Sequence, residues 1–190
     1  VGATFGDTVY VTGNPHTKLL AGRSFHNIIE VRSEEHDHGP QPTPSEIVES
    51  TLAAHAKYPN KRLIVHFMQP HSPIELDQET AIDDLSRAKW LEFYTRSLKN
   101  VTATARTLHQ RLNGKTIVSA DHGETHNRRL FGLFQIRNHP PMVRIPELVE
   151  VPWATLTGSR RHIEWGTTRK VEAADDVNER LRGLGYKQSD

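Results

Sequence analysis

Short apolar runs alternate with longer stretches of helical periodicity along the chain. Four of these runs predict strands, because β-branched and apolar residues dominate them and turn or polar residues bound them. The predicted strands cover residues 8–12, 27–31, 62–68 and 116–120. Strands that alternate with helices are typical of an α/β fold with a mainly parallel sheet, and such strands are covered on both faces.

The predicted helices carry recognisable start and stop signals. Thr43-Pro44-Ser45-Glu46 combines a capping threonine, a proline at the first helical position and a glutamate that reaches back, so a helix is expected over 45–58. A second helical region covers about 80–112, and Asn113-Gly114 ends it. The apolar positions of 171–184 lie on one face of a third helix.

The remaining segments are polar or punctuated by proline. Residues 32–42 predict a polar loop, and 155–170 predict an exposed polar segment. Residues 138–153 contain several prolines, which favour an extended segment at a sheet edge. A length of 190 residues fits a single domain over 1–190.

Composition excludes several classes of function. The chain holds 24 Lys+Arg and 23 Asp+Glu, so its net charge of +1 gives no reason to expect a nucleic-acid or membrane-surface partner. It has no cysteine, which excludes disulfides and thiolate metal sites. No apolar run is long enough to span a membrane, and no signal peptide opens the chain, so the cytoplasm is the expected location.

The 12 histidines are the unusual feature, at about three times the ordinary share. In open α/β sheets, ligands bind outside the carboxyl ends of the strands. Three predicted strands are each followed within a few residues by a histidine: His16, His71 and His122. If those strands are parallel neighbours, the three histidines converge on one edge of the sheet.

Asp121-His122-Gly123 is the sharpest candidate for metal binding. A carboxylate and an imidazole at one strand end can reach the same cation, and oxygen and nitrogen ligands suit Zn, Mn or Mg. Gly123 would let the backbone turn sharply beside the ion. The alternative is that Asp121 caps a turn and His122 is merely exposed. A working site needs further ligands, for which His126 and His139 are candidates.

Other histidines have weaker claims to a function. The prolines around His71 fix the direction of its imidazole, which suits contact with an anionic oxygen or a leaving group. The alternative is a hydrogen-bonded histidine in a rigid loop. His66 lies inside a strand and is interpreted as a satisfied core residue. The Glu34–His38 cluster is interpreted as a solvated loop, with metal storage as a weaker hypothesis.

Two segments carry a resemblance to a known family. Residues 62–73 form a strand followed by Pro-His-Ser-Pro, and residues 115–124 form a strand followed by Asp-His-Gly. Together they resemble sulfatase-like proteins of the alkaline phosphatase superfamily, of the archaeal type, and the similarity extends over nearly the whole chain. It implies a doubly wound, mainly parallel sheet with helices on both faces, in complete or truncated form. It also implies metal-assisted hydrolysis or transfer of a small phosphate or sulfate ester.

The resemblance also implies roles for single residues. Asp121 and His122 match the family's metal-ligand pair, for a divalent ion that is Zn, Mn, Mg or Ca. His71 matches a histidine that contacts the substrate's anionic group or leaving oxygen, and so has a catalytic role. His139 falls where related enzymes place another histidine that binds metal or substrate.

One departure from the family pattern matters for function. The family carries an acidic ligand and a Ser, Thr or Cys nucleophile after its first strand, and we find no such motif here. Asp7-Thr8 opens a predicted strand and does not end one. Without the nucleophile no covalent intermediate forms. Two alternatives stay open: an ester hydrolase whose missing segment lies upstream of Val1, or a catalytically inactive sulfatase-like domain with a binding or structural role.

Overall fold

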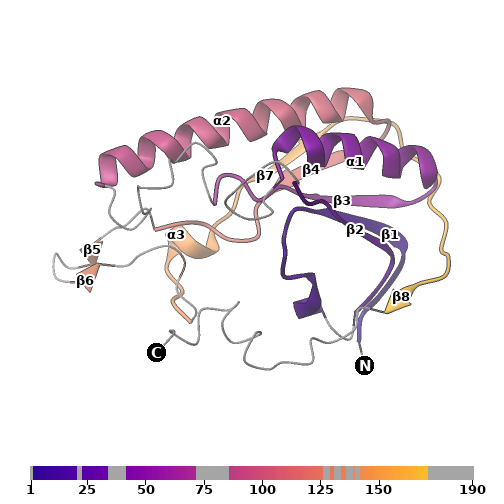
Figure 1. Ribbon diagram of the computed structural model, residues 1–190, viewed down its shortest axis with the longest axis horizontal. Helices are drawn as coiled ribbons and strands as arrows, with labels where there is room; N and C mark the ends of the chain where they lie inside the picture. The colour runs from indigo at the N-terminus through magenta and orange to yellow at the C-terminus, as the bar shows by residue number, and fades with distance from the viewer. Residues whose placement is uncertain are drawn as a thin grey trace.

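In the computed structural model of the protein, the described part of the chain has a mixed α/β architecture (Figure 1). The described residues are 2–20, 23–33, 42–71, 86–125, 129–130, 134–135, 139 and 142–170. The predicted helix over 171–184, the Glu34–His38 cluster and His126 lie outside them. The prediction of an α/β fold is confirmed at this level.

The main sheet has the strand order β3-β1-β2-β8. β1, β2 and β3 run parallel, as predicted, and β8 pairs with β2 in the antiparallel direction. These strands cover Thr4–Thr12 (β1), Ser24–Glu30 (β2), Arg62–His66 (β3) and Arg169–Lys170 (β8). Three of the four predicted strands therefore lie in one parallel sheet, with β1 at its centre.

The register of the sheet separates an apolar face from a more polar one. Val9 and Val11 of β1 are fully buried and pack on Ala54 of α1 (Pro44–Lys57). Leu63, which pairs with Val9, joins the same core from β3. Because side chains alternate along a strand, Thr8, Tyr10 and Thr12 of β1 lie on the opposite face.

The start of α1 is determined by its local sequence. The Thr43 hydroxyl accepts the Glu46 N–H, while the Glu46 carboxylate accepts the Thr43 N–H, which is a complete capping box. Pro44 occupies the first helical position, where the missing N–H has no cost. The helix predicted over 45–58 is thus confirmed with a shift of one residue at each end.

The second predicted helix is confirmed over α2 (Arg87–Arg111), which contacts α1 on the same side of the main sheet (Figure 1). Ser86 caps its start. Its end lies just before Gly114, whose φ of 119° is a left-handed conformation that favours glycine. In the part of the chain that is described, α1 packs on one face of the sheet and α2 packs against α1, and the predicted second helical layer is not shown.

β4 (Thr116–Ser119) does not join the main sheet, contrary to the expectation of parallel neighbours. Among the described strands it pairs with β7 (Trp153–Leu156), in the antiparallel direction, with Ser119 opposite Trp153. An apolar run predicts that a strand forms but does not determine its partner. The condition that the strands before His16, His71 and His122 are parallel neighbours is therefore not met by β4.

Residues 138–153 also differ from the extended edge segment that was predicted. Among the described residues, α3 (Pro146–Val149) forms a short helix, and a β-strand begins only at Trp153. Pro146 at the first helical position and Glu147 in the first turn are helix-start signals, which explain the difference.

Three small elements complete the described structure. They are the 3-10 helix η1 (Thr17–Leu20) and the antiparallel pair β5 (Arg129–Leu130) and β6 (Phe134–Gln135). Within the described ranges, no helix combines the length and the apolar character needed to cross a membrane.

Candidate metal centre

His71 is delivered by the loop that follows β3. Its backbone N–H donates to the Met68 carbonyl at 3.0 Å, which closes a turn. The buried side chain of Gln69 donates to the Pro42 carbonyl at 3.1 Å, and so ties the loop to the segment that leads into α1. His71 thus stands on an anchored loop, in line with the rigidity that its flanking prolines predict.

Asp121 and His122 follow β4 directly. The His122 Nδ1 lies 2.7 Å from the Gly123 carbonyl oxygen, so this nitrogen carries the proton and donates it. The other ring nitrogen, Nε2, lies 3.8 Å from Asp121 Oδ1. A ring whose second nitrogen donates to a carbonyl is the usual arrangement of a metal-binding histidine.

Gly123 is required by close packing against α3. Its N–H donates to the Leu148 carbonyl at 2.9 Å. A Cβ atom at this position would lie 2.0 Å from the Glu147 carbonyl oxygen, far inside van der Waals contact. The glycine was predicted to allow a sharp turn beside an ion. The structure shows instead that it lets the backbone of α3 approach and hold the Asp121–Glu124 segment.

Glu124 is a buried carboxylate paired with His139. Its Oε2 lies 3.4 Å from His139 Nδ1, and its Oε1 accepts the Thr125 N–H at 3.0 Å. Burial opposes ionisation, but the hydrogen bonds from His139 and Thr125 outweigh it and lower the pKa of Glu124. The same hydrogen bond to Glu124 raises the pKa of His139.

Three imidazoles gather at this place from separate segments. Ring centroids are 4.0 Å apart for His122 and His139, 4.8 Å for His71 and His139, and 6.4 Å for His71 and His122. Burial, together with the charge of His139, lowers the pKa of His71, which therefore stays neutral near pH 7. A neutral imidazole keeps a lone pair for a cation and an N–H for an anion.

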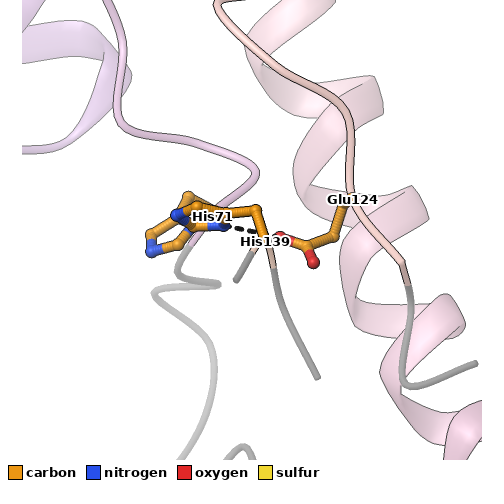
Figure 2. A group of neighbouring side chains, drawn as sticks. All are labelled: His71, Glu124 and His139. Carbon is orange, nitrogen blue, oxygen red and sulfur yellow. Dashed lines mark hydrogen bonds and ion pairs between the residues drawn. The ribbon is translucent and has the colours of Figure 1, made fainter. Parts of the chain in front are cut away.

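His71, Glu124 and His139 also form a compact donor set. Each offers one ligand atom, and these atoms all lie within 4.8 Å of one another. Figure 2 shows the two imidazoles lying together and the carboxylate of Glu124 directed toward them. Asp121, in contrast, is largely exposed beside His122.

The structure therefore brings together the residues that the sequence singled out for chemistry, namely His71, Asp121, His122 and His139. It adds Glu124, which the sequence analysis did not select. The available signal was its place directly after Asp-His-Gly, but its partner His139 lies 15 residues further along the chain.

Other candidates lie elsewhere or have structural partners. The His16 N–H donates to Asn14 Oδ1 within its own exposed turn. His66 bonds Tyr10 through Nδ1 at 2.6 Å, which agrees with its interpretation as a satisfied residue. Thr8 is buried inside β1 and donates to Asp7, while Asp7 pairs with Arg62 at 3.0 Å.

Comparison of the chain with protein-family models, with curated proteins and with solved structures finds no significant match.

Proposed function

We propose that the protein is a divalent-metal-dependent hydrolase or transferase that acts on phosphate or sulfate esters and has an alkaline-phosphatase-like core. The observation that carries the proposal is the gathering of His71, His122 and His139, with ring centroids 4.0–6.4 Å apart, beside the carboxylates of Asp121 and Glu124. Nitrogen and oxygen donors in one place suit a divalent cation such as Zn or Mn.

Asp121 and His122 are assigned to the cation. Two ligands at about 2.1 Å from one ion lie about 3.0–4.2 Å apart, depending on the angle between them. The 3.8 Å between His122 Nε2 and Asp121 Oδ1 falls in this range without any movement. The fit of the donor atoms therefore supports a metal at this pair, and a bound divalent ion supplies Lewis-acid polarisation of the ester oxygen.

His71 and His139 are assigned to the anionic part of the substrate. The hydrogen bond to Glu124 raises the pKa of His139, and an imidazole that keeps its proton can donate an N–H to an anionic oxygen. Neutral His71 can donate an N–H to the leaving oxygen. The partly exposed rings of both residues keep this side of the cluster open to a small substrate.

One observation favours the second candidate function, a catalytically inactive domain that binds ligands or has a structural role. Thr8, which follows Asp7, is only 5% exposed and lies within β1, before the strand reaches its carboxyl end. Its hydroxyl donates to Asp7, so it does not present a nucleophile to the histidines. The inactive domain would bind metal and anion without turnover.

Hydrolysis of 4-nitrophenyl phosphate and 4-nitrophenyl sulfate, measured with added Zn, Mn, Mg or Ca, tests the proposal. We expect metal-dependent release of nitrophenol. The double variant Asp121→Ala, His122→Ala should lower it at least about 100-fold, because even supporting residues around a metal contribute up to that factor. His162→Ala, at an exposed histidine that pairs with Glu164, is the matched control and should retain full activity.

Two outcomes would decide against the enzyme. Activity that survives the double variant undiminished would show that the assignment of Asp121 and His122 is wrong. Metal binding without turnover of any phosphate or sulfate ester would favour the inactive domain.

A further inference from the structure

We propose that the outward face of α2 binds an acidic polysaccharide that carries one anionic group per repeating pair of sugars. Four exposed side chains, those of Lys89, Arg96, Lys99 and Arg106, form a basic strip on this face. The proposal goes beyond the proposed function, because the strip lies outside the candidate metal centre and its binding requires no ester chemistry.

The positive charge of the protein is concentrated on α2. This helix includes six Lys or Arg residues and a single acidic residue, Glu92, whereas the whole chain has a net charge of only +1. The neighbouring helix α1 has no such excess, because it holds two glutamates and one lysine. The charge of α2 is therefore a local feature, and it can attract an anionic partner that the chain as a whole would not.

The basic strip lies on the side of α2 that points away from the core. The buried residues of the helix are Trp90, Ser97, Val101 and Leu108. At about 3.6 residues per turn, the strip falls on the opposite side of the helix axis. The other positions on that side hold Glu92, Thr95, Thr102, Ala103 and Gln110. The outward face is therefore polar, with more basic than acidic side chains.

The stability of α2 does not explain this charge. The helix dipole favours acidic residues in the first turn, yet the first turn of α2 contains Arg87 and Lys89 and no acidic residue. Glu92 and Arg96 form one ion pair along the helix, at 3.0 Å. Lys99 and Arg106 have no acidic residue three or four positions away, where such pairs form. Because most of these charges do not stabilise the helix, we assign them to a ligand.

The spacing of the strip selects the kind of polyanion. At a rise of 1.5 Å per residue, Lys89 and Arg96 lie about 10.5 Å apart along the helix axis, as do Lys99 and Arg106. A nucleic-acid strand carries a charge about every 3.4 Å, so most of its phosphates would have no partner on this surface. A polysaccharide with one carboxylate per disaccharide has more widely spaced charges, which match the strip.

The side chains of α2 also disfavour two other partners. Single-stranded nucleic acid is bound by stacking its bases on aromatic side chains, but Trp90, Phe93 and Tyr94 are buried or half-buried away from the strip. A helix that binds a membrane surface inserts large apolar side chains, and the outward positions hold none. Charge-assisted hydrogen bonds remain, and the carboxylates of an acidic polysaccharide accept them from Lys and Arg.

Binding of fluorescein-labelled hyaluronan to the full chain tests the proposal. Hyaluronan has one carboxylate per disaccharide and no phosphate or sulfate ester, so the proposed hydrolase would not consume it. We expect binding at low ionic strength that weakens as salt is added. The double variant Lys99→Glu, Arg106→Glu should weaken binding at least about 10-fold, because two attractive contacts become repulsive.

The matched control is the double variant Arg160→Glu, Arg169→Glu. It changes the net charge by the same amount at exposed positions outside α2, and it should bind hyaluronan as the unmodified protein does. All four substituted residues are exposed, and circular dichroism checks that both variants are folded. Hydrolysis of the 4-nitrophenyl esters should be unchanged in both, so this proposal and the proposed function can fail separately.

The remaining outcomes would overturn the proposal. Equal weakening in the two double variants would show that net charge alone attracts the polymer. Tighter binding of single-stranded DNA or of phosphatidylserine vesicles, lost on Lys99→Glu, Arg106→Glu, would assign the strip to a nucleic acid or a membrane. Absence of hyaluronan binding at low ionic strength would show that the strip has no such ligand.

Discussion

The face of the main sheet under α1 and the segment that carries the metal candidates are held in different ways. Under α1, the fully buried Val9 and Val11 of β1 pack against Ala54, and Ile47 of the helix is itself fully buried. In the β4–α3–β7 region, Ile117 and Trp153 are 47% and 68% exposed. There the chain is held by polar contacts, such as Gly123 N–H to the Leu148 carbonyl and Ser119 Oγ to the Pro152 carbonyl.

This difference indicates that one region stabilises the fold and the other positions the metal candidates. Burial of apolar area is the main favourable term in folding, so the region under α1 contributes most of the stability. The region around Gly123 buries less apolar area, but it positions several side chains of the candidate metal centre. We expect substitutions in the first region to change stability without changing metal binding, and substitutions in the second to change metal binding.

The largest effect on stability should come from Ile47→Ala. Ile47 is completely buried in α1, and removal of such a side chain costs about 2–5 kcal/mol. Urea unfolding should show this loss, while the remaining folded protein binds metal as before. Ile64→Ala is the matched control, because Ile64 is 46% exposed, and it should cost about 1 kcal/mol or less. Equal losses in the two variants would show that burial under α1 is not the main source of stability.

Gly123→Ala should affect both properties. The added methyl group would lie 2.0 Å from the Glu147 carbonyl oxygen, so α3 and the site segment must separate. Overpacking of this kind costs about 1–3 kcal/mol. The increase in melting temperature caused by Zn²⁺ should also disappear, because Asp121, His122 and Glu124 move with the backbone.

The control for this prediction is Ala120→Gly, in the same segment, which should cost less than about 1 kcal/mol and keep the response to Zn²⁺. An unchanged melting temperature and an unchanged response in Gly123→Ala would show that α3 does not hold the site.

Thr43→Ala should have an intermediate effect, of about 1 kcal/mol, because it removes the capping box of α1. Ser86→Ala, at the cap of α2, should cost less, since the Ser86 hydroxyl accepts the Lys89 N–H at a longer 3.4 Å. Thermal unfolding of both variants measures the difference. A larger loss of stability for Ser86→Ala would mean that the cap of α2 contributes more to the stability of the protein than the cap of α1.

The smallest effect concerns pH. Burial, and then the charge of Arg161, lower the pKa of His55 in α1. The unfolded chain therefore binds the proton more readily, and this contribution to stability is present above about pH 6.5 and is lost as the pH falls through the lowered value.

His55→Gln should accordingly reduce the loss of stability between pH 7.5 and pH 5.5 by a few tenths of a kcal/mol, after allowance for solvent screening. Urea unfolding of the metal-free protein at both pH values measures it, with His162→Gln as an exposed control. A steeper loss of stability with falling pH in His55→Gln would contradict the lowered pKa of His55.

Local sequence signals predicted the elements that local interactions specify. The capping box at Thr43 lies within four residues, so the start of α1 could be predicted closely. The strand ends before His71 and Asp121 were visible because apolar runs stop there, and these positions pointed correctly to the cluster. The short helix α3 was missed, although Pro146 and Glu147 were present as signals.

The sequence by itself thus determined the strand ends after which His71, Asp121 and His122 stand. Only the tertiary structure decided which of them meet. Pairing of β4 with β7, and of Glu124 with His139, depends on hydrogen bonds and charge between segments that are separate along the chain. Such pairing leaves no periodic pattern in the sequence of either segment, because each strand or side chain could by itself pair with many others.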